Sequence, residues 1–159
     1  TVGMLKQQVF LDDSLTVEEE FKKVCPLEQE TEYDCLFTKF GFKRQDKKRT
    51  LSSFSGGEQT KIALIRLLLE KPDILILDEP ISGVDQRGMD LFYRLVADLR
   101  KRHHIGILLV SHDFSVVEKY ATRVVLLDKT VLAQGSAQDV FGSTAFREVF
   151  GGSFVREVE

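Results

Sequence analysis

Residues 51–85, LSSFSGGEQTKIALIRLLLEKPDILILDEPISGVD, decide the fold of this chain. A helix should begin at Ser55, because apolar residues recur at the spacing of one helix face after Ser55-Gly56-Gly57-Glu58. The first backbone N–H groups of such a helix have no partner within it, and with the helix dipole they attract anions. Two glycines let a ligand approach the backbone closely. A phosphate site is one interpretation of this pattern.

The same four residues have a purely structural interpretation. Ser55-x-x-Glu58 is a capping box, in which the serine and glutamate side chains bind the free N–H groups of the helix start. Both interpretations predict the same helix, so they stay open at this point.

A continuous apolar run at residues 74–77, ILIL, follows the Lys-Pro-Asp stop at residues 71–73. Such a run predicts a strand that is buried on both faces of a parallel sheet. The run ends in Asp78 and Glu79, which places two carboxylates at the carboxyl end of a strand. Ligands of open α/β sheets bind at this edge, where one carboxylate can hold Mg²⁺ and its neighbour can act as a base toward water. An acidic turn that only ends the strand is the alternative.

A second apolar run at residues 105–110, IGILLV, predicts another buried strand. It delivers His112 to the same sheet edge as Asp78 and Glu79, where an imidazole can bind a phosphate oxygen and orient water. An amphipathic helix over residues 87–102 should cover one face of the sheet. Together these elements predict an α/β fold, with helices that flank a parallel sheet.

The succession of these motifs resembles the ATPase domains of the ABC family. SGGEQ at residues 55–59, ILILDEP at 74–80 and SGVD at 82–85 resemble the signature, the Walker B motif and the D-loop. The fold that this resemblance implies is that of a P-loop NTPase. A helical subdomain with the signature, over approximately residues 9–55, would precede the C-terminal part of the catalytic core at residues 56–159.

The resemblance also implies a role for each site residue. Asp78 would hold Mg²⁺, Glu79 would polarise the attacking water and His112 would be the second catalytic residue. Gln7 would reach the Mg²⁺ site from the Q-loop. The residues expected to face nucleotide or the dimer seam are Ser55, Gly56, Gly57, Glu58 and Asp85, the first three against the γ-phosphate of an ATP held by the opposite subunit.

The chain departs from the family pattern in three places. Phe54 stands where the signature usually has leucine, and Glu58 stands where many members have glutamine, which adds negative charge near a phosphate. No Gly-Lys pair occurs, so the loop Gly-x-x-x-x-Gly-Lys-Ser/Thr is absent from these residues. We therefore expect the C-terminal two-thirds of an ABC ATPase domain, without its N-terminal strands and P-loop. By itself this piece should be poorly stable and inactive.

The resemblance implies an ATPase, the nucleotide-binding subunit of an ABC transporter, in particular of a metal-ion importer that works with ATP and Mg²⁺. Its partners would be a second ABC ATPase domain in a head-to-tail dimer and a transmembrane permease subunit, at the cytoplasmic face of the cell membrane. The alternative is an ABC-F ATPase that acts on the ribosome in translation or antibiotic resistance, and only this alternative implies a nucleic-acid partner. Residues 1–80 resemble ABC-F proteins and the rest resembles zinc or manganese importers, so a join near LDEP at 77–80 is a hypothesis.

Composition excludes several other classes. With 159 residues, 43% of them hydrophobic, the chain can bury a real core, and a net charge of −3 argues against an electrostatic grip on nucleic acid by the whole domain. Cys25 and Cys35 should be free thiols. The basic run at residues 43–49 is interpreted as a solvated loop, with RNA contact as the alternative. Phenylalanines 10, 21, 37, 40 and 42 are interpreted as core, with a groove for a transporter helix as the alternative.

Overall fold

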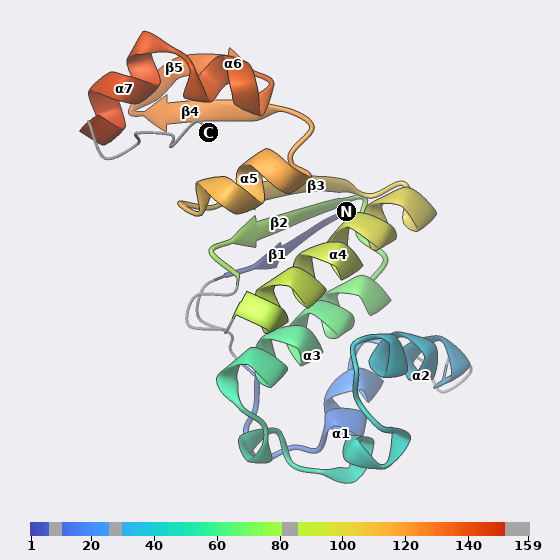
Figure 1. Cartoon of the computed structure of the whole chain (residues 1–159). Helices are drawn as coiled ribbons and strands as arrows, with labels where there is room; N and C mark the ends of the chain where they lie inside the picture. Colours follow the sequence, from blue (N-terminus) through green and yellow to red (C-terminus); the bar gives the residue numbers. More distant parts are fainter. Residues whose placement is uncertain (7–10, 26–29, 81–85, 152–159) are drawn as a thin grey trace. The chain divides into compact units, whose positions relative to one another are not determined.

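The computed structural model describes residues 1–6, 11–25, 30–80 and 86–151 (Figure 1). The chain divides into two compact units, Thr1–Ser111 and His112–Glu159. Each unit has its own set of buried apolar side chains. Within the described ranges, no helix combines the length and the apolarity that crossing a membrane requires.

The first unit contains a parallel sheet with the strand order β1-β2-β3 (Figure 1). Its strands are β1 (Val2–Leu5), β2 (Ile74–Asp78) and β3 (Gly106–Val110). The central strand β2 pairs Leu77 with Leu5 on one side and Asp78 with Val110 on the other. Parallel strands end at the same edge of a sheet, so the carboxyl ends of β2 and β3 lie together. The predicted α/β fold with a parallel sheet is confirmed.

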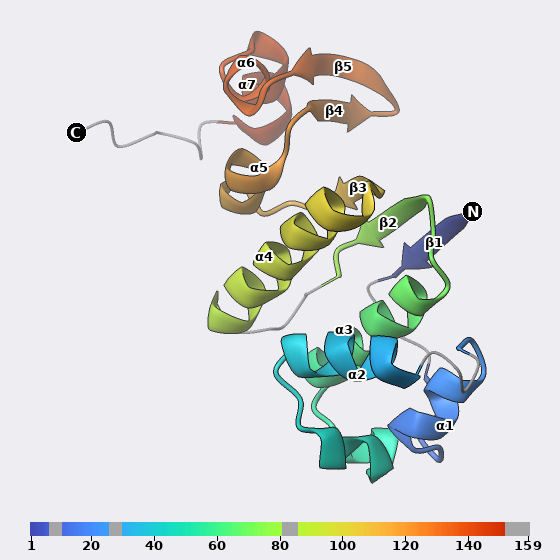
Figure 2. The ribbon, with the colours of Figure 1, turned by 90° about the vertical axis from the view of Figure 1, so that its right-hand side faces the viewer.

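Only one face of this sheet is covered by the described helices of the first unit. Helices α3 (Gly56–Leu69) and α4 (Gln86–His103) lie on the same side of it in Figures 1 and 2. Side chains along a strand point alternately to the two faces of the sheet. In β2, Leu75 and Leu77 are buried on the face that the helices cover, whereas Ile74 on the other face is 46% exposed. The prediction that residues 74–77 are buried on both faces is therefore wrong. The large apolar side chains on the exposed face are Val2, Met4, Ile74, Leu108 and Val110.

A layer of short helices packs against α3: α1 (Val17–Lys22), α2 (Glu30–Lys39) and the 3₁₀ turns η2 (Arg44–Lys48) and η3 (Leu51–Ser53). The pattern Thr16-x-x-Glu19 predicts a capping box. The structure confirms it at the start of α1, where the Thr16 hydroxyl accepts from Glu19 N and the Glu19 carboxylate accepts from Thr16 N. Gly41 follows α2 with φ 88°, a left-handed conformation that suits glycine at a helix end.

Aromatic side chains form the core of this helical layer. Phe37 stacks on Phe42 with ring centroids 4.5 Å apart, and Phe42 meets Phe54 edge to face at 5.8 Å. Phe21 and Phe40 are fully buried with them. The interpretation of these phenylalanines as core is therefore confirmed, whereas Phe10 lies outside the described residues.

The basic run at residues 43–49 is mostly exposed, as its composition predicts, but it forms a 3₁₀ turn rather than a loop. Lys47 donates to Asp34 and lies over the ring of Tyr33, and Arg44 approaches the same carboxylate. Arg49 stacks on Phe54, with its guanidinium carbon 4.2 Å from the ring centroid, and donates to Ser53 O at 2.9 Å. Of these cations only Lys47 is largely covered, and the Arg44 side chain stays 78% exposed.

In residues 112–151, the described part of the second unit, the chain forms a hairpin and three helices. Strands β4 (Val124–Asp128) and β5 (Thr130–Gly135) pair antiparallel, and α5 (Phe114–Tyr120), α6 (Ala137–Phe141) and α7 (Thr144–Phe150) accompany them. Its core is Leu126, Val140 and Phe146. The largely apolar runs at 123–127 and 131–133 on either side of Asp-Lys-Thr predict a hairpin, and Gly135-Ser136 predicts the start of a short helix; the structure confirms both. The sequence also predicts that Ser111 caps a helix that runs through Tyr120. This prediction is wrong, since Asp113 accepts from the N–H groups of Ser115 and Val116 immediately before α5 begins.

Candidate active site

Two carboxylates stand at the carboxyl end of the central strand β2. Asp78 is the last residue of the strand and lies opposite Val110 of β3. The next residue, Glu79, donates its backbone N–H to Val110 O at 3.0 Å, so β3 holds the turn that follows β2. Both acidic residues are half-buried. The structure thus puts Asp78 and Glu79 together at the predicted edge, with part of each side chain open to solvent.

The backbone of Glu79 is strained. Its φ is 44°, in the left-handed region that residues with a side chain rarely adopt. Such a conformation costs about 1 kcal/mol or more and persists where the surroundings impose it, which is common at functional sites. The described residues hold three other non-glycine residues with positive φ: Lys71 and His104 follow the ends of α3 and α4, where this conformation is usual, and Lys129 is the turn residue between β4 and β5. Glu79 ends a strand, so helix capping does not account for its conformation.

The start of α3 is a closed capping box. The Ser55 hydroxyl accepts from Glu58 N at 3.4 Å, and Glu58 Oε2 accepts from Ser55 N at 2.8 Å and from the Ser55 hydroxyl at 2.9 Å. The structural interpretation of the pattern is therefore realised. It does not use the two glycines, because a capping box needs only its serine and glutamate.

The same helix start is open to a ligand. Ser55 and Gly56 are exposed and Gly57 is half-buried. A Cβ atom built on Gly56 would have no neighbour within 4 Å, and the φ of Gly56 is not positive, so neither packing nor backbone conformation requires glycine there. The phosphate interpretation of Ser55, Gly56 and Gly57 therefore stays compatible with the closed capping box.

Gln59 fixes the loop ahead of α3, a role that the sequence does not predict. Its side-chain Nε2 donates to Leu51 O at 3.0 Å and lies 3.5 Å from Phe54 O. These bonds tie the helix to η3, so the loop and the helix start form one local structure. Nothing in the residue type or spacing distinguishes Gln59 from a solvent-exposed glutamine.

The described structure does not test the remaining predicted residues. His112 is exposed and begins the second unit, so its place beside Asp78 and Glu79 stays a prediction. Gln7 and Asp85 lie outside the described residues. Next to His112, a hydrogen bond from the Ser115 hydroxyl lowers the pKa of Asp113 below its ordinary value of 3.8. That carboxylate serves as the cap of α5.

The described residues hold no cluster of three or more histidine, cysteine or acidic side chains suited to a metal ion. A Mg²⁺ ion does not need one, because it keeps several waters and is bound through one or two carboxylates together with substrate phosphates. Asp78, half-buried at the end of β2, can supply such a carboxylate. The donor set therefore fits a magnesium–nucleotide complex rather than a metal ion bound by protein alone.

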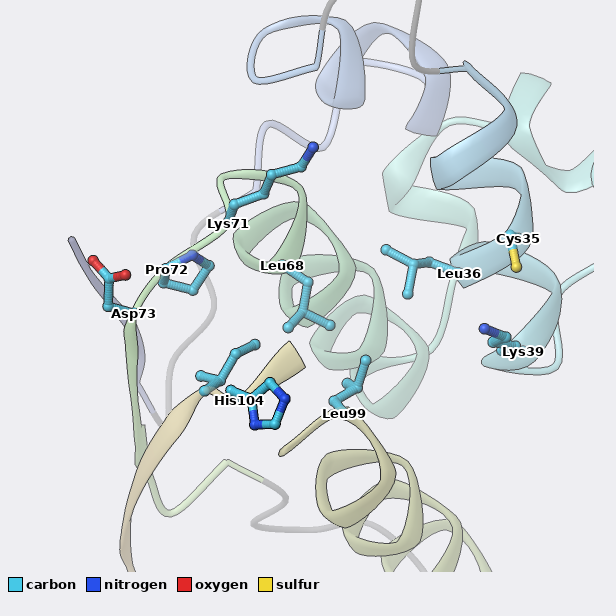
Figure 3. Close-up of a pocket in the computed structure, with 10 residues that line it drawn as sticks. Cys35, Leu36, Lys39, Leu68, Lys71, Pro72, Asp73, Leu99 and His104 are labelled. Carbon is cyan, nitrogen blue, oxygen red and sulfur yellow. The ribbon is translucent and has the colours of Figure 1, made fainter. Parts of the chain in front are cut away.

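A pocket of about 600 Å³ lies in the first unit, away from these carboxylates (Figure 3). Pro72 and Asp73, which precede β2, are part of its lining, so it belongs to the opposite end of that strand from Asp78. In Figure 3 the side chains of Leu68, Leu99 and His104 point toward one another between the helices. The pocket is therefore not the predicted site.

Comparisons with known proteins agree with this geometry. Residues 1–82 match the family described as ABC transporter. The chain is 45% identical over 104 residues to the zinc import ATP-binding protein ZnuC of Pseudomonas aeruginosa (strain UCBPP-PA14), an alignment that covers 65% of this chain and 39% of that protein. It is 41% identical to ZnuC of Hydrogenovibrio crunogenus, again over 65% of this chain and 40% of that protein.

Solved structures of ABC transporter proteins have a similar fold. The chain resembles cbiO1 from Clostridium perfringens, part of the ABC transporter complex cbiONQ, with a TM-score of 0.75, 25% identity and coverage of 93% of this chain and 62% of that one. An inward-facing structure of a proposed metal-chelate type ABC transporter gives a TM-score of 0.81 at 18% identity, covering 94% and 64%. The chain spans about two-fifths of the length of the curated relatives that it matches. By its sequence and by its fold, this chain belongs to the ABC transporter family.

Proposed function

We propose that this chain contributes an ATP-hydrolysing site to the nucleotide-binding subunit of an ABC transporter. The observation that carries the proposal is the end of β2, where Asp78 closes the central strand and Glu79 follows in a strained turn held by β3. Ligands of open α/β sheets bind at this edge. The resemblance of SGGEQ and ILILDEP to the signature and Walker B motifs supports the same assignment.

Asp78 would bind the Mg²⁺ ion that accompanies ATP. When bound, the ion neutralises charge that develops on the phosphate oxygens. The carboxylate of Asp78 orients the ion at the strand end, because β2 is held between two neighbouring strands and cannot shift without breaking both pairings. Gln7 is proposed as a second group that reaches this ion.

Glu79 would polarise the water that attacks the γ-phosphate. A base must lie within hydrogen-bond reach of the proton that it accepts. The bond from Glu79 N to Val110 O keeps the backbone of this residue in place, so its side chain starts from a fixed point at the sheet edge. His112, which follows β3 by two residues, is proposed to bind a phosphate oxygen and orient the same water.

The start of α3 would receive the γ-phosphate of an ATP that a second copy holds. The exposed backbone at Ser55 and Gly56 and the half-buried Gly57 provide N–H donors at a helix start, where negative charge is stabilised. Glu58 lies at the same end and adds a charge that the phosphate must tolerate. Asp85 is proposed to lie at the seam between the two copies.

We further propose zinc import as the transported activity, because two curated relatives at 45% and 41% identity are zinc import ATP-binding proteins. The partners would be a second ATPase domain and a transmembrane permease at the cytoplasmic face of the membrane. Growth under zinc limitation that depends on an intact Glu79 tests this cargo. The ribosome-bound alternative is not favoured by the relatives reported above, which are transporter proteins.

The test uses the protein that contains residues 1–159 at its natural length. Glu79→Gln keeps the size of the side chain and removes its negative charge. We expect Mg²⁺-dependent ATP hydrolysis to fall by about 100-fold or more, the range of a lost general base. ATP affinity should stay within about threefold of wild type, and ATP should now hold two copies together, as measured by sedimentation.

Asp98→Asn is the matched control, because Asp98 is an exposed carboxylate on α4. It should change neither hydrolysis nor association. A Glu79→Gln protein that hydrolyses ATP at the wild-type rate would remove Glu79 from the assigned role. A wild-type protein without any ATP hydrolysis would contradict the proposed function as a whole.

A further inference from the structure

Glu20 is the one charged side chain that is buried among the residues that the structure describes. Only 4% of it is exposed, on helix α1. It follows Glu18 and Glu19, and a run of three glutamates in the first turn of a helix indicates a solvated face. Burial of a carboxylate is unfavourable unless charges and hydrogen bonds compensate it, so its surroundings need an explanation.

Two cations compensate Glu20. Arg66 on α3 places Nε 3.1 Å from Glu20 Oε1, and Lys23 donates from Nζ to Glu20 Oε2 at 2.7 Å. Arg66 also approaches Glu70 with Nη2 at 3.7 Å. The pair Glu20–Arg66 joins residues 46 positions apart in the sequence and connects α1 directly to α3.

Stability does not explain this pair. A buried ion pair seldom stabilises a protein more than well-packed apolar side chains of similar volume would. The geometry is also not optimal, because within the described residues Arg66 Nε has no acceptor in hydrogen-bond geometry, despite the short distance to Glu20. The contact is therefore electrostatic, and it lacks the hydrogen bond that an ideally placed arginine–glutamate pair would add.

The pair instead fixes the position of α1 relative to α3. If α1 slid along α3 or turned about its axis, the buried carboxylate would keep Lys23, which follows the same helix, but would lose Arg66, its partner on α3, and such a loss is unfavourable. Apolar contacts alone specify such a register less sharply, because Val17 and Phe21 on the same helix could pack against several neighbouring positions. Glu20 therefore defines one placement of α3 on the helical layer.

That placement controls the start of α3. Gly56 and Arg66 are ten residues apart on one helix, or about 15 Å at 1.5 Å per residue. A tilt of about 5° at Arg66 would move the helix start by about 1 Å. Displacements of this size at a reacting group lower rates by on the order of 100-fold.

We propose that Glu20 is a positioning residue that holds the start of α3 in the orientation required to receive the γ-phosphate of the partner copy's ATP. The proposal rests on the proposed function, since it concerns the same helix start. It differs from a structural role in one respect: the fold should tolerate loss of the pair, whereas ATP-dependent association should not.

The experiment measures three quantities in the protein at natural length: the melting temperature, the ATP affinity of the single copy, and the ATP-dependent association of copies that carry Glu79→Gln. The double variant E20M/R66M replaces the ion pair by two apolar side chains. It should melt within a few degrees of the parent protein and bind ATP equally well, but associate about tenfold more weakly. The milder variant Glu20→Gln should weaken association about threefold.

Glu18→Gln is the matched control on the same helix. Glu18 pairs with Lys22 at 2.7 Å, but this pair is partly exposed and does not reach α3, so association should be unchanged. Association of E20M/R66M and Glu20→Gln equal to that of Glu18→Gln would overturn the proposal. A double variant that fails to fold would overturn it too, because the pair would then be structural. If Glu79→Gln copies never associate with ATP, the proposed function fails instead.

Discussion

The start of α3 and the end of β2 are both predicted phosphate-facing elements, yet they are built differently. At the start of α3, Ser55 and Glu58 satisfy each other in a capping box, and the local structure is complete without a ligand. At the end of β2, Asp78 is followed by Glu79 in a left-handed conformation that no helix cap explains. The first element follows from ordinary helix chemistry, whereas the second needs a further reason.

The difference shows which observation carries the functional assignment. A capping box occurs in many helices without any ligand, and this chain has others at Thr16 and Ser136. Two carboxylates in a strained turn at the carboxyl end of a central strand are less easily explained by structure alone. What sets the start of α3 apart from the other two boxes is its pair of glycines.

Gly56→Ala tests whether the glycine at the start of α3 serves a ligand or the fold. The backbone conformation of Gly56 suits alanine and the site has room for a Cβ atom, so the free energy of unfolding should stay equal or rise by up to about 1 kcal/mol. The added Cβ atom should keep the phosphate from approaching the backbone N–H groups closely. ATP-dependent association of Glu79→Gln copies should therefore weaken by about tenfold or more, the size of one weakened hydrogen bond to a charged group. Urea unfolding and sedimentation measure the two effects.

Gly106→Ala is the control for that variant. A Cβ atom there would meet its nearest neighbour at 3.6 Å, an ordinary contact, and Gly106 begins β3 far from the carboxyl edge. Association should be unaffected. If Gly56→Ala lowers stability and leaves association intact, the glycine serves the fold and the start of α3 is only a cap.

A smaller effect is expected from Glu58→Gln. The glutamine can still accept from Ser55 N, but the favourable charge at the helix start is lost, so the free energy of unfolding should fall by about 0.3–1 kcal/mol. Removal of a negative charge near a phosphate should strengthen ATP-dependent association a few-fold. Urea unfolding measures the change in stability, and sedimentation measures the change in association.

Glu19→Gln makes the same change in the capping box of α1, where Glu19 accepts from Thr16 N at 2.8 Å. It should cost similar stability and leave association as it was. Equal effects of the two variants on association would mean that Glu58 does not lie near the phosphate.

Local sequence chemistry predicted much of the fold. The helix starts at Thr16, Ser55 and Ser136 were recognisable because capping residues stand at fixed spacing before an apolar pattern. The end of β2 was recognisable because a run of four large apolar residues meets two acids. These signals depend on neighbours in the sequence, and the structure confirms them.

Features that depend on distant residues could not be predicted. Burial of residues 74–77 was overestimated, because composition cannot tell how many faces of a sheet the available helices cover. Nothing in the local sequence distinguishes Glu20 from Glu18 and Glu19, since its partner Arg66 is 46 positions away. The cap of α5 was assigned two residues too early, because Ser111 and Asp113 are both good capping residues and only the helix start at Phe114 selects between them.

The most direct test of the central claim is in-trans complementation between two inactive variants. Glu79→Gln disables the end of β2, and Gly56→Asp places a carboxylate where a phosphate should bind while keeping a residue that suits a helix start. In a dimer whose sites each combine both elements from different copies, an equal mixture should recover about one quarter of wild-type ATP hydrolysis, because half of the dimers then carry one intact site. A mixture that stays as inactive as either variant alone would show that the two elements do not meet across copies, and would contradict the account.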